Sequence, residues 1–130
     1  MITIGIFTTS RADFGIYKPL LNQIDLQEDI CYKLFVGGSH IKKEEGYNIS
    51  KTFDLIPKKD SDYYLTKSSA IATDQLAEIF QDESFDFVCV LGDRFELLSI
   101  IQTAIIYRKP IIHIHGGEIS EGAIDDQIRH

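Results

Sequence analysis

The sequence predicts an α/β protein with a doubly wound parallel sheet. Short apolar, β-branched runs recur along the chain, and segments with helical periodicity separate them, which is typical of buried parallel strands joined by helices. Polar, glycine-containing segments follow several of these runs directly, as expected where parallel strands end. With right-handed crossovers, the order βαβαβαβαβ gives a Rossmann-like domain.

The expected elements follow from this periodicity. Strands are predicted at residues 2–8, 30–36, 53–57, 85–91 and 111–115. Helices are predicted at residues 14–27, 41–50, 66–81 and 94–107. The first helix is expected to bury Ile16, Leu20 and Ile24, with Pro19 near its start, where proline is tolerated. The last helix is apolar almost all round, which predicts burial on both sides.

Composition limits the classes of function. A chain of 130 residues that is 44% hydrophobic predicts one domain with a proper core. Its net charge of −7 argues against nucleic-acid binding as a main task, because that task needs a basic face. Cys31 and Cys89 lie in apolar strand-like runs, which favours two reduced core thiols over a disulfide or a zinc site.

The two ends of the chain also carry expectations. The N-terminus is typical of a first strand rather than of a signal peptide, and no apolar run approaches 18 residues, so a soluble cytoplasmic protein without membrane contact is expected. Residues 123–130 are typical of a helix start, with Asp125 or Asp126 as its cap. A chain that stops there favours a truncated gene product or an expressed fragment.

Two segments directly after predicted strands carry the most informative polar residues. They are residues 91–96 (Leu-Gly-Asp-Arg-Phe-Glu) and residues 113–118 (His-Ile-His-Gly-Gly-Glu). Ligands of open α/β sheets bind beyond the carboxyl ends of the strands, so the two segments are expected to build one site. Asp93 at such a position could act as a base or bind a substrate hydroxyl, although the simpler interpretation is a helix cap.

The histidines and acids of the second segment allow several kinds of chemistry. His113 and His115 alternate, so their side chains are expected on the same face of the strand. With Glu118 they would make three metal ligands, but no further ligand has clear spacing and a metal site is disfavoured. Acids that share a cleft can supply both an acid and a base, whereas a solvated acidic loop is the simpler interpretation. The acids in question are Glu118, Glu121, Asp125 and Asp126.

The segments that follow the carboxyl ends of the first two strands, here called the exits of these strands, are weaker candidates. Residues 8–13 (Thr-Thr-Ser-Arg-Ala-Asp) lead into the first helix, where exposed amides favour an anion. Arg11 adds a guanidinium group that can donate two parallel hydrogen bonds to phosphate. A capping turn with a solvated arginine is an equal alternative. A dinucleotide fingerprint is absent, because the chain has no GxGxxG motif. Residues 37–40 (Gly-Gly-Ser-His) allow close backbone approach to a ligand, or form a plain turn.

Taken together, these motifs resemble those of the hydrolysing UDP-N-acetylglucosamine 2-epimerases of sialic acid biosynthesis, and of relatives that act on nucleotide-linked diacetamido sugars for legionaminic acid. The matching motifs lie at residues 10–15, 92–96, 113–118, 121–126 and 129–130. The resemblance implies a glycosyltransferase-B fold with its active site between two Rossmann-like halves. Residues 1–130 would form the N-terminal half, and the C-terminal nucleotide-binding domain would be absent from this chain.

The resemblance also implies a reaction in two stages. UDP is eliminated across C1–C2 of UDP-N-acetylglucosamine to give a glycal, and water then adds with reprotonation at C2 to give N-acetylmannosamine. No metal or nicotinamide cofactor is implied. The candidate catalytic residues are Asp93, Glu118, Asp125 and His115, and the candidate substrate-binding residues are Ser10, Arg11, His40, Arg94, His113 and Asp126. His115 stands where some members carry a glutamate, so proton transfer falls to Glu118 with Asp93, or to His115.

Other functions remain open at this point. The chain could be a catalytically incomplete module that binds a ligand or assembles with a partner. A response-regulator-like or flavodoxin-like domain is a third hypothesis, for which Asp13 alone is weak support. The substrate could be UDP-N-acetylglucosamine or a UDP- or GDP-linked diacetamido sugar. The apolar helix around residues 97–106 and the family's tendency to associate favour a homodimer.

Overall fold

The computed structural model describes residues 1–38, 46–54, 61–92, 95 and 97–114, without the side chain of Arg11. Five strands form one parallel sheet in the order β3-β2-β1-β4-β5. The strands are β1 (Ile2–Thr8), β2 (Ile30–Gly37), β3 (Ile49–Phe53), β4 (Phe87–Leu91) and β5 (Ile111–Ile114). The chain runs outward from β1 to β3 and then returns to β4 on the other side of β1. This order confirms the predicted doubly wound sheet.

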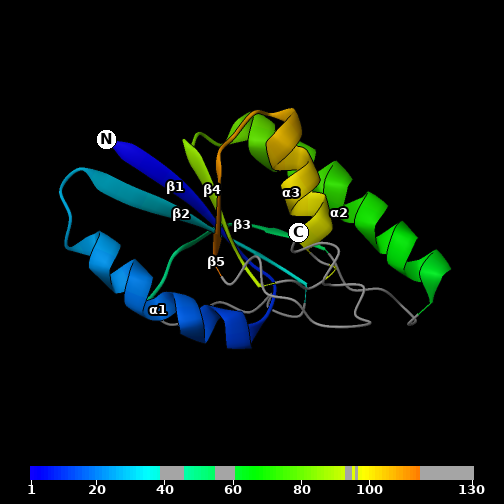
Figure 1. Cartoon of the computed structure of the whole chain (residues 1–130), viewed down its shortest axis with the longest axis horizontal. Coiled ribbons are helices and arrows are strands. Elements are labelled where there is room, and N and C mark those ends of the chain that lie inside the picture. The colour runs from blue at the N-terminus through cyan, green and yellow to red at the C-terminus, as the bar shows by residue number, and fades with distance from the viewer. Residues whose placement is uncertain (39–45, 55–60, 93–94, 96, 115–130) are drawn as a thin grey trace.

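Helices cover both faces of the sheet (Figure 1). They are α1 (Arg11–Asp25) on one face, and α2 (Asp62–Asp82) and α3 (Leu97–Ile106) on the other. Both α1 and α2 begin at a serine cap, because Ser10 Oγ accepts the N–H of Asp13 and Ser61 Oγ accepts the N–H of Tyr64. None of the helices in the described ranges is long and apolar enough to cross a membrane.

An aromatic cluster fills the core between the sheet and α2 and α3. Phe7 of β1 lies at its centre and is 1% exposed. The centroid of the Phe7 ring lies 4.8 Å from that of Phe35, 5.6 Å from Phe80, 6.0 Å from Phe85 and 6.3 Å from Phe53. Aromatic side chains bury much apolar area each, so this cluster holds three strands and α2 together.

The other face of the sheet packs against α1, and here the predicted buried stripe needs correction. The helix buries Phe14, Tyr17, Leu21 and Ile24, whereas Ile16 is exposed and Leu20 is half-buried. The helix starts at Arg11, three residues earlier than predicted, so Phe14 and Tyr17 belong to its inner face. Pro19 therefore lies in the interior of the helix rather than near its start.

Two further expectations were wrong. The helix predicted over residues 41–50 is wrong in its described part, because residues 46–48 are not helical and residues 49–53 form β3. The strand predicted at 53–57 therefore begins four residues earlier and shares only Phe53 with β3, and residues 55–57 lie outside the described ranges. Residues 41–45 lie outside the described ranges. The middle residues of β3 are polar and exposed because β3 is an edge strand.

Helix α3 is buried on one side instead of two. Leu97, Ile100 and Ala104 pack into the core, and the partly buried Ile101 packs against it. The exposed apolar residues of α3 are Leu98, Ile105 and Ile106. The reason is that, in the described part of the chain, α3 packs chiefly against a single helix, α2.

Both cysteines lie in strands, as predicted, and carry free thiols. Cys31 in β2 is partly exposed, and Cys89 in β4 is buried. Burial raises the pKa of the Cys89 thiol to about 11. Cys89 is therefore protonated and inert at neutral pH, as a core thiol should be.

Gly37→Ala is expected to lower the free energy of unfolding by about 1–3 kcal/mol, as overpacked cores do. A Cβ at Gly37 would lie 2.3 Å from Cε2 of Phe53, and the buried Phe53 ring packs against Phe7 and cannot simply move away. Urea unfolding measures the change. Gly15→Ala is the control, because its Cβ would meet nothing within 4 Å and the helix should gain about 0.5–1 kcal/mol. A G37A variant as stable as the wild type would contradict this packing.

Candidate functional site

The ends of four strands lie together at the carboxyl edge of the sheet. The strand order reverses between β1 and β4, and ligands of doubly wound sheets bind at this switch point. The exit of β2 adjoins that of β1, because a Cβ on Gly38 would lie 2.9 Å from the carbonyl oxygen of Thr9. The exit of β5 adjoins that of β4, because Gly92 N–H donates to the Ile114 carbonyl over 2.8 Å. The predicted meeting of the strand exits is therefore present.

The exit of β1 is a tightly bonded capping turn. Ser10 Oγ accepts the N–H of Asp13 over 3.1 Å, and Thr8 Oγ1 donates to the carbonyl of Ser10 over 3.2 Å. Thr9 Oγ1 donates to Asp13 Oδ2 over 3.5 Å. Thr8, Thr9 and Ser10 are buried. This turn aims the positive end of α1 at the carboxyl edge of the sheet, where it would favour an anionic ligand.

Ser10→Ala is expected to cost about 1 kcal/mol of stability, because the N–H of Asp13 loses its acceptor. Ser10→Asp should restore most of this loss, since aspartate is an equally good cap. Thermal unfolding of the three proteins measures the effect. If S10A were as stable as the wild type, the hydroxyl would not be the cap that holds this turn.

The exit of β4 turns sharply at Gly92 and is braced by β5. Gly92 has a φ of 82°, a conformation that glycine adopts without strain. His113 of β5 contacts the carbonyl oxygen of Gly92 through Nε2. A carbonyl oxygen only accepts, so Nε2 carries the proton and donates. His113 thus supports the β4 exit, and its predicted contact with substrate stays a prediction.

The other predicted site residues fall outside the described ranges. These are His40, Asp93, Arg94, His115, Glu118, Asp125 and Asp126. Arg11 is described only as the first residue of α1. The structure therefore brings the capping turn with Ser10 and the brace of His113 on Gly92 to one edge, and the remaining assignments stay predictions.

Sequence reasoning missed Tyr17, whose hydroxyl lies between β1 and β4. Tyr17 is fully buried, and its hydroxyl donates to the carbonyl of Phe7 over 3.2 Å, with the carbonyl of Cys89 at 3.5 Å. Burial raises the pKa of Tyr17, helped by the nearby Cys89 and Asp13. A tyrosine at a helical core position gives no signal of this kind, because the contact depends on how α1 is placed on the sheet.

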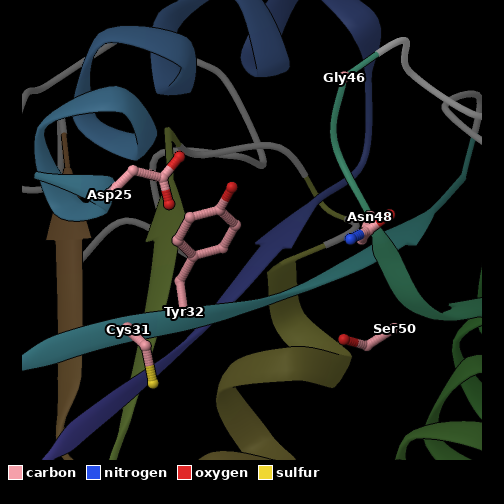
Figure 2. A pocket seen from close by; sticks show the side chains of 6 residues that line it. All are labelled: Asp25, Cys31, Tyr32, Gly46, Asn48 and Ser50. Carbon is pink, nitrogen blue, oxygen red and sulfur yellow. The ribbon is translucent and has the colours of Figure 1, made fainter.

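A pocket of about 350 Å³ lies at the opposite, amino edge of the sheet. It is lined by Asp25, Cys31, Tyr32, Gly46, Asn48 and Ser50. The notch arises because β3 pairs with β2 only from Leu34 onward. Figure 2 shows that Tyr32 and Asp25 lie on one side of β2 while Cys31 points to the other. Its polar groups do not converge, so this pocket is not a candidate for the site at the carboxyl edge.

The fold and the strand exits define the chain as a Rossmann-like α/β domain with a polar edge at its switch point. Residues 22–130 match the model of the family described as UDP-N-acetylglucosamine 2-epimerase, and the chain belongs to this family. The resemblance predicted from the motifs is therefore confirmed, and the match is to the N-terminal portion of the family.

Three relatives illustrate the match. The chain is 31% identical, over 98% of its length, to the GDP/UDP-N,N'-diacetylbacillosamine 2-epimerase (hydrolyzing) of Campylobacter jejuni, and it covers 35% of that protein. It is 32% identical over 95% of its length to the UDP-N,N'-diacetylbacillosamine 2-epimerase (hydrolyzing) of Legionella pneumophila, covering 35%. It is 31% identical over its whole length to the UDP-N-acetylglucosamine 2-epimerase of Neisseria meningitidis, covering 36%. The chain thus spans about a third of these relatives.

Solved structures show the same fold. A crystal structure of a UDP-N-acetylglucosamine 2-epimerase superimposes with a TM-score of 0.80 at 15% identity, over 98% of this chain and 39% of that one. The Neisseria meningitidis enzyme bound to UDP-GlcNAc superimposes with a TM-score of 0.79 at 16% identity, over 99% of this chain and 37% of that one. The predicted likeness to part of a glycosyltransferase-B fold is confirmed at the level of the fold.

Proposed function

We propose that the chain forms the N-terminal part of the active site of a hydrolysing sugar-nucleotide 2-epimerase. The observation that carries this proposal is the place of the β1 and β4 exits on either side of the switch point of the sheet. The motifs that begin with Ser10 and Gly92 start at these exits. Membership of the family and the names of the relatives support the same reaction class.

The proposed reaction needs two kinds of protein group. Elimination breaks the C1–O bond to the diphosphate and removes the proton at C2, so it needs positive charge and a base. The N-terminus of α1 together with Arg11 would stabilise the leaving diphosphate. Asp93, with Glu118 or Asp125, would move the proton at C2, and His115 is the alternative to Glu118. Hydration of the glycal places hydroxyl at C1 and a proton at C2 from the other face.

The proposed substrate is UDP-N-acetylglucosamine, and the alternative is a UDP- or GDP-linked diacetamido sugar. The Neisseria meningitidis relative supports the first, and the Campylobacter jejuni and Legionella pneumophila relatives support the second. A place in sialic or legionaminic acid biosynthesis, in the cytoplasm, would follow. The exposed apolar residues of α3 support association as a homodimer.

A second candidate function is a catalytically incomplete module that binds a ligand or assembles with a partner. It is favoured by one observation, namely that the chain covers about a third of its relatives. The Rossmann-like domain would then contribute binding contacts without carrying out the reaction.

Incubation of the 130-residue chain with each of the three sugar nucleotides in D₂O separates these functions. Proton and phosphorus NMR should show free nucleoside diphosphate and a 2-epimer carrying deuterium at C2, and the active nucleotide identifies the substrate. A second arm replaces the matching segment of the Campylobacter jejuni relative with this chain. Turnover by that hybrid supports the epimerase function if the isolated chain is inactive. A folded hybrid that turns over none of the three would overturn it in favour of the binding module.

A further inference from the structure

The sheet divides at its carboxyl edge between β1 and β4. Their pairing runs through Ile4↔Phe87, Gly5↔Val88 and Ile6↔Cys89 and then ends. On the outer sides, β1 stays paired with β2 as far as Thr8, and β4 stays paired with β5 as far as Leu91. We call this division the fork. Two halves of the sheet, each internally paired, therefore separate where the candidate site begins.

Tyr17 occupies the fork. Its hydroxyl is 3.2 Å from the carbonyl of Phe7, the first residue of β1 beyond the ladder, and 3.5 Å from the carbonyl of Cys89, the last paired residue of β4. The side chain is fully buried among apolar residues of α1, β1 and β4. Because burial also raises the pKa of Tyr17, the hydroxyl keeps its proton and remains a donor. The hydroxyl proton of Tyr17 is thus shared between the carbonyl of Phe7 in one half of the sheet and that of Cys89 in the other.

The distance along the chain from the fork to the site is the same on both strands. Ser10 lies three residues after Phe7, and Gly92 lies three residues after Cys89. Tyr17 lies in α1, the helix that Ser10 caps. Its hydroxyl therefore also ties the N-terminal half of α1 to β4. The contact at the base of the fork therefore lies the same number of residues before each exit.

We propose that Tyr17 is a positioning residue that fixes the separation of the β1 and β4 exits. Its catalytic consequence rests on the proposed epimerase function. The hydroxyl holds the end of α1 at Ser10 at a set distance from the β4 exit at Gly92. Misplacement of reacting groups by about 1 Å can cost on the order of a hundredfold in rate, so a contact this close to both exits has a large effect.

Hydrogen–deuterium exchange of the 130-residue chain tests the positioning role without any activity. Tyr17→Phe removes the hydroxyl and keeps the ring, and it should speed exchange about tenfold in peptides covering residues 7–10 and 89–92, as expected for a lost buried hydrogen bond. Tyr107→Phe is the matched control, because its hydroxyl binds the exposed Gln81 Oε1 instead. Ile100→Val is a second control, for a general loss of stability in the core.

The outcomes separate a local role from a general one. Faster exchange at both exits in Y17F, and in neither control, supports the proposal. Unchanged exchange at the exits, equally faster exchange in β2 and β3, or failure of Y17F to fold would each overturn it.

Kinetics extend the test to catalysis wherever the wild-type chain turns over a sugar nucleotide. Y17F should lower kcat about ten- to hundredfold with KM changed less than about twofold, because the geometry of the reacting groups changes while most binding contacts remain. A kcat equal to that of wild type would overturn the catalytic consequence. An inactive wild-type chain and hybrid would remove the proposed function, and the exchange experiment would still decide the role of Tyr17 in the fork.

Discussion

Asp93→Asn is expected to lower sugar-nucleotide turnover by about 10²- to 10⁴-fold, the usual contribution of a general acid or base. The amide has nearly the shape of the carboxylate but cannot take up the C2 proton. Asp93 directly follows Gly92 in the sequence, and Gly92 lies after β4 beside the switch point between β1 and β4. Release of nucleoside diphosphate, followed by phosphorus NMR, measures the loss, and thermal unfolding shows whether the variant stays folded.

Asp86→Asn is the matched control for this substitution. Asp86 directly precedes β4, at the opposite end of this strand from Gly92. Its Oδ2 accepts the N–H of Thr3 over 2.9 Å. The same chemical change there should leave turnover within about twofold, because an exposed contact far from the site contributes little. Turnover by D93N at the wild-type rate would remove Asp93 from the mechanism. Equal losses in both variants would indicate a defect of folding instead.

The strands buried on both faces were the easiest elements to predict. Parallel strands between two helical layers are mostly apolar, so the runs at β1, β2 and β4 stand out from the sequence. Strand β1 has the predicted bounds of residues 2–8, and β2 extends one residue further than predicted. The right-handed crossover then restricts the order of the strands, which explains why the meeting of their exits could be predicted.

Elements with one solvent-facing side were harder to predict. The residues of β3 alternate weakly because the strand is at the edge, so its first two residues were predicted as helix and only Phe53 as strand. Helix α3 is apolar almost all round, yet Leu98 and Ile105 are exposed. The composition of a helix says which sides can be buried, but a neighbouring element decides which sides are buried.

The features of the candidate site also fall into those that the local sequence predicts and those that depend on packing. A capping turn was one of the two interpretations of residues 8–13, and the structure assigns the cap to Ser10 because α1 begins at Arg11. The contacts of His113 with Gly92 and of Tyr17 with Phe7 and Cys89 join residues far apart in the sequence. Such contacts depend on how strands and helices are placed, so no local pattern predicts them. The roles of Asp93 and of the acids after β5 stay predictions.

Phe7→Ala is expected to be the most destabilising single substitution in the described core. Phe7 is 1% exposed and its ring contacts those of Phe35, Phe80 and Phe85. Truncation of a buried phenylalanine to alanine costs about 3–5 kcal/mol, because transfer free energy is lost and a cavity remains. Domains of this kind have about 5–15 kcal/mol of total stability, so the variant should be close to unfolding. The midpoint of urea unfolding measures the change.

Tyr63→Ala provides the control for F7A. Tyr63 is an aromatic residue of α2 that is 63% exposed, so its truncation should change stability by less than about 0.5 kcal/mol. The contrast between F7A and Tyr63→Ala tests whether the aromatic cluster supports the strands that lead to the site. Phe7 is also linked to the fork, because its carbonyl accepts the hydrogen bond of the Tyr17 hydroxyl. In F7A, exchange should therefore rise throughout β1, β2 and α2, in contrast to the local effect of Y17F. A loss of under about 1 kcal/mol would mean that the neighbouring rings close the cavity and that the cluster is not the main support of the sheet.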